Sequence, residues 1–517
     1  MLTLDKLVIG QSAKILKVKG NGANRQHLLD MGILPETIIK LDKTAPLGDP
    51  MEFLLKGYKL SLRKEDAKYI TVELCEEEIT NTNNKKNQTL HPGLGENGIK
   101  FHDKKNENPL PDNHILSFAL VGNQNAGKTT LFNQLTGSNQ HVGNFPGVTV
   151  DKKDGQIRKH KNTLITDLPG IYSMSAYSSE ELLSRNFILN NKPDGIINVV
   201  DATSIERGLY LTMQLLELDI PMVLALNMID EIDNNGGYID INNLENELGI
   251  PVIAISASKN QGIDELIQHA IHIAKYQEKP ILKDYCDEND NGGQVHRCLH
   301  SIMHLIDNHA HDASLPLRFC ASKCVENDTQ IIDMLQLDKN ELESIEHIIK
   351  QMEDERKLDR AAAIADMRYS FIHKITKDNV IKPNQSSEQI VSNKIDKILT
   401  GKFTAIPCFI LIMFTIFYLT FELIGPFLSD VVGNIISIIA LFIDDGLIAL
   451  NINPTLHNLL IEVVFEGIGS LISFLPVVLV LFLFLSILED SGYMARIAFV
   501  MDKWNYRLGV VIELGGE

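Results

Sequence analysis

The pattern of apolar and polar positions divides the chain into four regions. In residues 1–78, short β-rich runs alternate with turns, as in SAKILKVKG, TIIKLDKTA, MEFLLKGYKLSL and YITVEL. One helical stretch, RQHLLDMG, lies between the first two runs. Short strands separated by turns predict a small, strongly curved β-barrel of the SH3-like kind. Residues 79–113 are polar and rich in Asn and Gly, which indicates a flexible linker.

From residue 114 to residue 275, apolar runs of strand length alternate with segments of helix length. The runs ILSFALVG, GIINVVD, PMVLALN and PVIAIS have the continuous hydrophobicity of strands buried on both faces. This alternation predicts a doubly wound α/β domain with a mostly parallel sheet. Beyond it the strand pattern stops, and charged helical segments predict an all-helical domain over residues 276–395.

The region 396–517 has the composition of transmembrane α-helices. Two apolar stretches, at about residues 403–421 and 467–488, are long enough to cross a bilayer, which takes about 20 residues. The segment VVGNIISIIALFI between them is too short to predict a third crossing. The stretch from Glu422 to Glu466 contains no Lys or Arg, whereas basic residues flank it on both sides. The positive-inside rule therefore predicts two crossings with an exported stretch between them, and a cytoplasmic location for the preceding domains.

Composition narrows the function classes. The formal charge of −19 argues against a nucleic-acid-binding surface, which needs clustered basic charge. The six cysteines have no paired spacing, so we expect no disulfide framework and a reducing compartment. The first residues, MLTLDKLVIG, lack the apolar segment of a cleaved signal peptide.

A phosphate-binding loop follows the first strand of the α/β region. The sequence GNQNAGKTT lies between the strand ILSFALVG and the helix TTLFNQLTG. Consecutive backbone N–H groups at a helix N-terminus can cradle phosphates, Lys128 can neutralise their oxygens, and the Thr129 hydroxyl can bind Mg²⁺. The predicted loop residues are Gly122, Asn123, Gln124, Asn125, Ala126, Gly127, Lys128, Thr129 and Thr130.

The other parts of a nucleotide switch follow in order. Asp167, Leu168, Pro169 and Gly170 end a strand, where Asp167 can hold the Mg²⁺ shell and Gly170 can sense the γ-phosphate. In NFPGVTV, Thr149 is the candidate switch threonine for the same metal. Asn227, Met228 and Asp230 end a later strand, and the Asp230 carboxylate can accept from guanine N1 and N2, which adenine does not match. Ser256, Ala257 and Ser258 follow the next strand as a base-contacting loop. The sequence therefore predicts a GTPase.

Two positions differ from the usual GTPase pattern. Met228 stands where a lysine commonly follows the asparagine, so nucleotide binding is expected to be weak and exchange fast. Ile171 stands where a water-orienting glutamine is common. An aliphatic side chain cannot orient water, so we expect slow hydrolysis that needs help from another group.

Several long segments resemble the ferrous-iron transport protein B family. They are DLPGIYSMSAYSSEE, INVVDATSIERGLYLTMQLLELDIPMVLALNMID and FLSILEDSGYMARIAFVMD. The stretch LLDMGILPETIIKLDKTAPLGDPMEFLLKGYKLSLRKEDA is similar to the small partner protein A, here fused in front. The resemblance implies Fe²⁺ uptake across a bacterial inner membrane, gated by a cytoplasmic GTPase through a helical coupling domain. It further implies a K⁺ ion held by Asn125 beside the β/γ bridge, which would make Asn125 catalytic together with Lys128, Thr149 and Gly170. The alternative is that the Asn125 side chain only hydrogen-bonds the loop's own backbone.

The same resemblance implies further membrane spans after residue 509, so the sequence reads as a truncated product. The alternative function is therefore a membrane-anchored regulatory GTPase, or an inactive remnant without transport. We expect the fused barrel to contact the chain's own GTPase domain, and the pattern is compatible with a homo-oligomer. Two carboxylates at the end of an apolar span, Glu489 and Asp490, are candidates for the ion route or its gate.

The helical region contains histidines and cysteines that are candidates either for metal binding or for a structural role. His296, His300 and His304 fall on one helical stripe, which can be a metal-binding patch but is more often a solvated polar face. Cys320 and Cys324 share a helical face and are expected to be packing residues.

Overall fold

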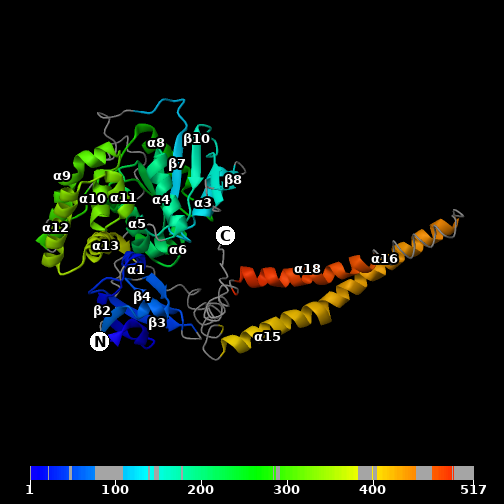
Figure 1. The fold of residues 1–517 in the computed structure, drawn as a ribbon. Helices are drawn as coiled ribbons and strands as arrows, with labels where there is room; N and C mark the ends of the chain where they lie inside the picture. The colour runs from blue at the N-terminus through cyan, green and yellow to red at the C-terminus, as the bar shows by residue number, and fades with distance from the viewer. Residues whose placement is uncertain are drawn as a thin grey trace. The chain divides into compact units, whose positions relative to one another are not determined.

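The computed structural model divides into two compact units (Figure 1). The first contains most of residues 1–386, and the second is mainly Ser387–Glu517. The described residues are 2–20, 22–45, 49–56, 58–75, 109–137, 140–144, 151–175, 178–282, 284–286, 292–381, 399, 404–449, 469–491 and 493. Most of the expected linker, residues 79–113, lies outside them.

The amino-terminal region forms a small six-stranded sheet with the order β1-β6-β2-β3-β4-β5. Its elements are β1 (Leu2–Thr3), η1 (Leu4–Lys6), β2 (Ser12–Val18), α1 (Ala23–Asp30), β3 (Ile38–Thr44), β4 (Met51–Leu55), β5 (Tyr58–Leu62), α2 (Lys64–Ala67) and β6 (Ile70–Cys75). Alternate residues of β5, namely Tyr58, Leu60 and Leu62, are buried, as expected when one face of a sheet covers a core. The predicted small β domain is confirmed.

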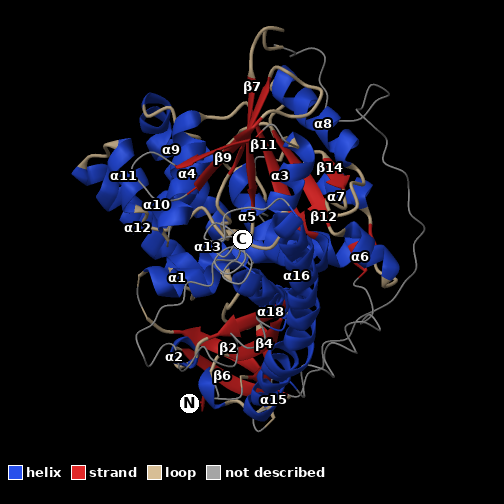
Figure 2. Cartoon of the chain, turned by 90° about the vertical axis from the view of Figure 1, so that its right-hand side faces the viewer, coloured by secondary structure: helices blue, strands red, loops and turns tan. Residues whose placement is uncertain are grey.

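The central domain is built on a seven-stranded sheet with the order β14-β12-β11-β7-β10-β9-β8, flanked by helices in Figure 2. Five neighbouring strands are parallel: β7 (Leu116–Gly122), β10 (Thr163–Asp167), β11 (Gly195–Asp201), β12 (Met222–Asn227) and β14 (Val252–Ala254). The strands β9 (Asp151–Gly155) and β8 (Gln140–Asn144) extend the sheet in antiparallel pairs. Because β7 lies between β10 and β11, the strand order reverses there, and ligands of such sheets bind at the carboxyl end of that position.

Helices connect these strands and cover the sheet. They are α3 (Lys128–Thr136), α4 (Ser179–Asn191), η2 (Ala202–Ser204), α5 (Ile205–Leu216), α6 (Ile229–Asn234), α7 (Ile241–Leu248) and α8 (Ile263–Tyr276). Apolar residues of β7, α3 and α8, among them Phe118, Phe132 and Leu266, share one buried cluster. The predicted doubly wound α/β domain is confirmed.

Five helices follow as the helical domain. They are α9 (Gln294–Asp312), α10 (Leu317–Val325), α11 (Thr329–Leu335), α12 (Lys339–Arg356) and α13 (Arg360–Asn379). One detail differs from the sequence-based expectation that strands stop after the α/β domain. Residues Val380–Ile381 form a short strand, β15, which pairs with β13 (Tyr238–Ile239) of the central domain. A two-residue strand carries too little periodic signal to be predicted.

The second unit contains two helices long and apolar enough to cross a membrane, at Ala405–Asp444 and Leu471–Glu489. The first runs from α15 (Ala405–Tyr418) through a π-helical turn, η4 (Leu419–Leu423), into α16 (Ile424–Ala449). Pro426 lacks the N–H that would bond to the Glu422 carbonyl, and a wide turn accommodates that loss. The segment VVGNIISIIALFI thus belongs to a continuous helix rather than to a separate short element.

Helices α16 and α18 (Gly469–Asp490) pack along small residues. The Ser429 Oγ donates to the Ser473 carbonyl at 2.5 Å. A Cβ added at Gly469 would lie 2.9 Å from the Ile436 side chain, so the backbones approach closely there. Close approach at small residues is how helices associate in membranes. Large apolar side chains such as Phe442, which is 79% exposed, point away from this contact.

Candidate nucleotide-binding site

The phosphate loop connects the carboxyl end of β7 to the first turn of α3, as predicted. Lys128 is buried, and its Nζ donates to the Asn123 carbonyl at 3.0 Å. Burial lowers the pKa of Lys128. A phosphate oxygen can take the place of the Asn123 carbonyl, because the loop curls around the ammonium group. Gln124, Thr129 and Thr130 are exposed, so the open side of the loop faces solvent.

Asn227 ties the phosphate loop to the loop after β14. Its amide nitrogen donates to the Ala126 carbonyl at 2.9 Å, and its carbonyl oxygen accepts from the Ala257 N–H at 3.0 Å. Gly127 has a φ of 85°, and a Cβ there would collide with the Asn227 amide. Both functional atoms of Asn227 are thus used within the protein, which makes it a residue that positions the site.

Asp230 lies in the first turn of α6 with a partner that the sequence analysis did not find. Its Oδ2 is 2.8 Å from the Nζ of Lys259. The hydrogen bond from Lys259 lowers the pKa of Asp230. Lys259 directly follows Ser256, Ala257 and Ser258, so its position beside the predicted base loop was a usable signal. The structure brings Asp230 and that loop together.

Asp167 ends β10 beside Lys128 and Thr129. Burial raises the pKa of Asp167 to about 6, although Lys128 and the Thr129 hydroxyl act in the opposite direction. Its buried Oδ1 has no hydrogen-bond partner among the described residues. Buried carboxylate oxygens nearly always have one. An unpartnered carboxylate oxygen beside a threonine hydroxyl is a donor set suited to Mg²⁺, so these residues fit the predicted ion.

The segment after Asp167 packs tightly on the phosphate loop. A Cβ at Gly170 would lie 2.8 Å from the Gln124 side chain, and the Ile171 N–H donates to the Gly122 carbonyl at 3.2 Å. Ile171 is fully buried, so it cannot contact an attacking water. The neighbouring Tyr172 hydroxyl donates to Gln124 at 3.2 Å. Gly170 is therefore in close contact with the phosphate loop.

Asn125 lies at the exposed tip of the loop with a φ of 63°. Within the described part of the chain, its side chain makes no hydrogen bond to another residue. The alternative in which Asn125 merely bonds the loop's own backbone therefore has no support here. A free amide oxygen at this position can serve as a ligand for a monovalent cation.

Buried charges link the segment after Gly170 to the helical domain. Glu326 accepts from Lys323 and from Arg368, each at 2.6 Å. Lys323 also donates to the Ser175 hydroxyl at 2.9 Å. Burial alone would raise the pKa of Glu326, but Lys323 and Arg368 hold it at about 2. Ser175 lies five residues after Gly170, so these contacts join the segment after β10 to α10 and α13.

The remaining predicted residues have different outcomes. Thr149 lies outside the described residues, as does the side chain of Asp490, while Glu489 is exposed at the end of α18. Cys320 and Cys324 are buried packing residues, as expected. The histidine stripe is divided: His296 and His300 are partly buried, whereas His304 is exposed.

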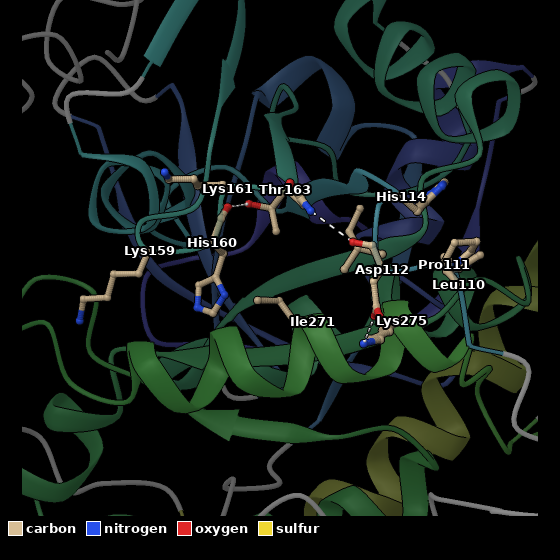
Figure 3. Close-up of a pocket in the computed structure, with 12 residues that line it drawn as sticks. Leu110, Pro111, Asp112, His114, Lys159, His160, Lys161, Thr163, Ile271 and Lys275 are labelled. Atoms are coloured by element: carbon tan, nitrogen blue, oxygen red, sulfur yellow. Dashed lines mark hydrogen bonds and ion pairs between the residues drawn. The ribbon is translucent and has the colours of Figure 1, made fainter.

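A hollow of about 570 Å³ lies at the opposite edge of the sheet (Figure 3). It is lined by residues near the amino ends of β7 and β10 and by α8, and an ion pair between Asp112 and Lys275 at 2.8 Å crosses its rim. Parallel sheets bind their ligands at the carboxyl ends of strands. This hollow is therefore separate from the nucleotide site.

Comparison with known proteins assigns three domains. Residues 2–74 match the FeoA domain, residues 116–270 match "Ferrous iron transport protein B", and residues 292–381 match the FeoB cytosolic helical domain. The chain is 34% identical over 536 residues to the Fe(2+) transport protein A/Fe(2+) transporter FeoB fusion protein of Porphyromonas gingivalis, covering 98% of this chain and 62% of the relative. It is 38% identical over 399 residues to the Fe(2+) transporter FeoB of Legionella pneumophila, covering 76% of this chain and 50% of the relative.

Among solved structures, the chain is similar to NFeoB from S. thermophilus bound to GDP.AlF4- and K+. The two are 40% identical, with a TM-score of 0.45, over 51% of this chain and 99% of that one. The chain spans 50% to 62% of the length of the two relatives described above.

Proposed function

The chain belongs to the ferrous iron transport protein B family with a FeoA domain fused in front, and from that premise we propose a function. The protein is a GTP-hydrolysing switch that drives Fe²⁺ uptake across a bacterial plasma membrane. The observation that carries the proposal is the convergence of Lys128, Asp167 and Asp230 at the carboxyl ends of β7, β10 and β12, joined through Ser175 to the helical domain.

The chain's own residues divide the work of binding and hydrolysis. The loop amides and Lys128 hold the phosphates, and Asp230 recognises guanine. Asp167 and the Thr129 hydroxyl would hold Mg²⁺, which supplies positive charge for the phosphate oxygens. Gly170 lies against Gln124 and therefore detects the γ-phosphate position. The Asn125 side chain would hold K⁺, whose charge would offset that of the leaving oxygen, as an arginine finger does in other GTPases.

We propose that the FeoA domain acts on its own GTPase. Its Asp30 is buried, and the carboxylate accepts from the Tyr210 hydroxyl of α5 at 2.7 Å. The Asp30 carbonyl accepts from the Tyr369 hydroxyl of α13 at 2.7 Å, and the two tyrosine rings stack at 4.8 Å. These contacts support a regulatory role. A variant without residues 1–78 should hydrolyse GTP at a changed rate; unchanged rate and nucleotide affinity would contradict this role.

Proteoliposomes test the transport proposal. The protein is reconstituted with nucleotide and a fluorescent iron chelator trapped on the side of the soluble domains, and Fe²⁺ is added anaerobically to the other side. Wild-type vesicles should take up Fe²⁺ with GTP, and Lys128→Ala should abolish uptake. In Asp230→Asn, Fe²⁺ uptake should require xanthosine triphosphate in place of GTP. In Asp233→Asn, a change on the same helix, uptake should still require GTP.

Each failure has a distinct meaning. GTP hydrolysis without any Fe²⁺ uptake would favour the alternative, a regulatory GTPase for which the apolar helices are only an anchor. An unchanged preference for GTP in Asp230→Asn would overturn the assignment of Asp230.

A further inference from the structure

Four potential metal ligands meet between the GTPase domain and the helical domain. Asp284, Cys286, His296 and His300 each offer one donor atom, and these atoms lie within 4.8 Å of one another. None of them belongs to the nucleotide site. We propose that this set binds one divalent transition-metal ion, of the class that includes Zn²⁺, Co²⁺ and Fe²⁺. Two imidazoles, a carboxylate and a thiolate form a mixed N, O and S set that suits such ions and not Mg²⁺ or Ca²⁺.

Local geometry accounts for the convergence. His296 and His300 are four residues apart on α9, so they share one face, and their ring centroids are 4.2 Å apart. Asp284 and Cys286 are two residues apart in a segment without helical structure, and both reach these histidines. Tyr285 between them contacts Glu217 instead, through its hydroxyl. The segment thus directs two potential metal ligands toward α9. Its Tyr285 binds Glu217 at the end of α5.

The distances are close to those of a loaded site. The His300 Nε2 is 2.6 Å and the His296 Nδ1 is 3.5 Å from the Asp284 Oδ2, and the Cys286 Sγ is 3.4 Å from the same His296 nitrogen. In a tetrahedral site with bonds of about 2.0 to 2.3 Å, donors lie about 3.3 to 3.8 Å apart. The two distances to the His296 nitrogen fall in that range, and the His300 and Asp284 side chains would have to move apart to admit an ion.

A supporting layer holds the carboxylate. The Asp284 Oδ1 accepts from the Cys286 N–H at 3.0 Å and lies 3.4 Å from the Arg318 guanidinium, which leaves Oδ2 to face the histidines. Outer contacts of this kind orient ligands in metal sites. The guanidinium repels a dication, but the carboxylate and the thiolate together supply two negative charges. Binding releases the thiol proton to solvent, because only the thiolate is a ligand.

A bound ion would fix the segment that connects the GTPase domain to the helical domain. Residues 284–286 follow α8, the last helix of the GTPase domain, and precede α9. Through Tyr285 the same segment contacts Glu217, which pairs with the buried Arg368 at 3.3 Å. Metal binding would therefore restrict movement between the nucleotide site and the helical domain. The metal-binding inference is independent of the proposed transport function.

Cobalt spectroscopy on the full chain tests the proposal. The protein in detergent is stripped with a chelator, given GDP and excess Mg²⁺, and titrated with Co²⁺. We expect one Co²⁺ per chain, with visible bands of a four-coordinate site and a near-ultraviolet band from the thiolate. Cys286→Ser should lose the near-ultraviolet band, and His300→Ala should weaken Co²⁺ binding by about tenfold or more. GDP binding by each variant checks that the fold is retained.

His304→Ala is the matched control, because His304 continues the same helical stripe but is exposed and outside the cluster. It should leave the spectrum and the affinity unchanged. Anaerobic competition identifies the ion: displacement of Co²⁺ by Zn²⁺ alone indicates a structural zinc site, and comparable displacement by Fe²⁺ indicates a sensor for iron. A spectrum that is the same in wild type, Cys286→Ser and His300→Ala, or no Co²⁺ binding at all, would overturn the proposal.

Discussion

At the scale of single residues, the ion pair between Asp230 and Lys259 bears on nucleotide binding. The Lys259 side chain is 50% exposed, and its Nζ lies 2.8 Å from the Asp230 carboxylate, which we propose as the acceptor for guanine. Guanine and Lys259 therefore compete for one acceptor. Exposed ion pairs contribute about 0 to 1 kcal/mol, so the competition is mild.

Removing the competitor should strengthen nucleotide binding. We expect Lys259→Ala to lower the Kd for GDP by up to about fivefold, the factor that corresponds to about 1 kcal/mol. Titration with a fluorescent GDP analogue measures this, and Lys161→Ala serves as a control for the loss of a remote positive charge. A Kd raised tenfold or more would instead mean that Lys259 contacts the bound nucleotide, contrary to this account.

The positions of the predicted nucleotide-site residues in the fold could be anticipated from short motifs. Lys128, Asp167 and Asp230 each end or follow a strongly apolar strand, so their common edge followed from the parallel topology. The partners Lys259, Asp284 and Cys286 were not found, because their roles depend on tertiary contacts. The spacing of His296, His300 and His304 placed them on one face of a helix. Only the fold shows that Asp284 and Cys286 lie beside the first two histidines and that His304 is outside this cluster.

At the scale of elements, the strands and helices with strong periodicity were predicted and the short ones were not. The runs that became β7, β11 and β12 are buried except at Ser117 and Asp201, which agrees with their continuous apolar sequence. The two-residue β15 and the continuation of α15 into α16 escaped prediction. The strand β15 has no periodic signal. The segment VVGNIISIIALFI was judged by its own length, whereas in the fold it continues the preceding helix through a π-helical turn.

At the scale of elements, the buried charges around Glu326 join α10 to α13. Glu326→Gln removes the ion-pair partner of Lys323 and leaves Arg368 with Glu217 alone. This loss should destabilise α10 and α13 by about 3 to 5 kcal/mol. Hydrogen exchange followed by mass spectrometry reports this as faster exchange in those helices. Glu343→Gln, which alters an exposed pair with Lys339, should change stability by less than about 0.5 kcal/mol.

The lowered pKa of Glu326 predicts the pH range over which the protein loses stability. Since Lys323 and Arg368 hold the pKa of Glu326 at about 2 against burial, its stabilisation is complete above the ordinary value of 4.5 and is lost as the pH falls from 4.5 towards 2. Wild-type protein should therefore lose helical circular dichroism more steeply in that window than Glu326→Gln. Parallel acid profiles for the two proteins would argue against the ion cluster.

At the scale of the whole molecule, the length of the first apolar helix bears on the membrane topology of the chain. Residues 405–449 form one helix of about 67 Å at 1.5 Å per residue, longer than the hydrocarbon core of a bilayer at about 30 Å. A single crossing therefore leaves several turns outside the hydrocarbon. The acidic stretch from Glu422 to Glu466 favours export of that part.

Reporter fusions test this topology. A reporter fused after Asn453 should be active on the external side of the membrane, and one fused after Lys503 should be active in the cytoplasm. Both positions lie outside the described residues, so the prediction rests on the charge pattern of the sequence. Activity of both reporters on the same side would refute the two-crossing arrangement.

The central claim is that this phosphate loop hydrolyses GTP with help from a cation held by Asn125, since Ile171 is buried and cannot orient water. The most direct measurement is the GTP hydrolysis rate of the full chain in K⁺ and in Na⁺. We predict a rate at least about tenfold higher in K⁺, because a fixed charge beside the leaving oxygen stabilises the transition state. Asn125→Ala should remove that difference while retaining GTP binding through Lys128 and the loop amides. Equal rates in the two salts for the unmodified protein would contradict the account.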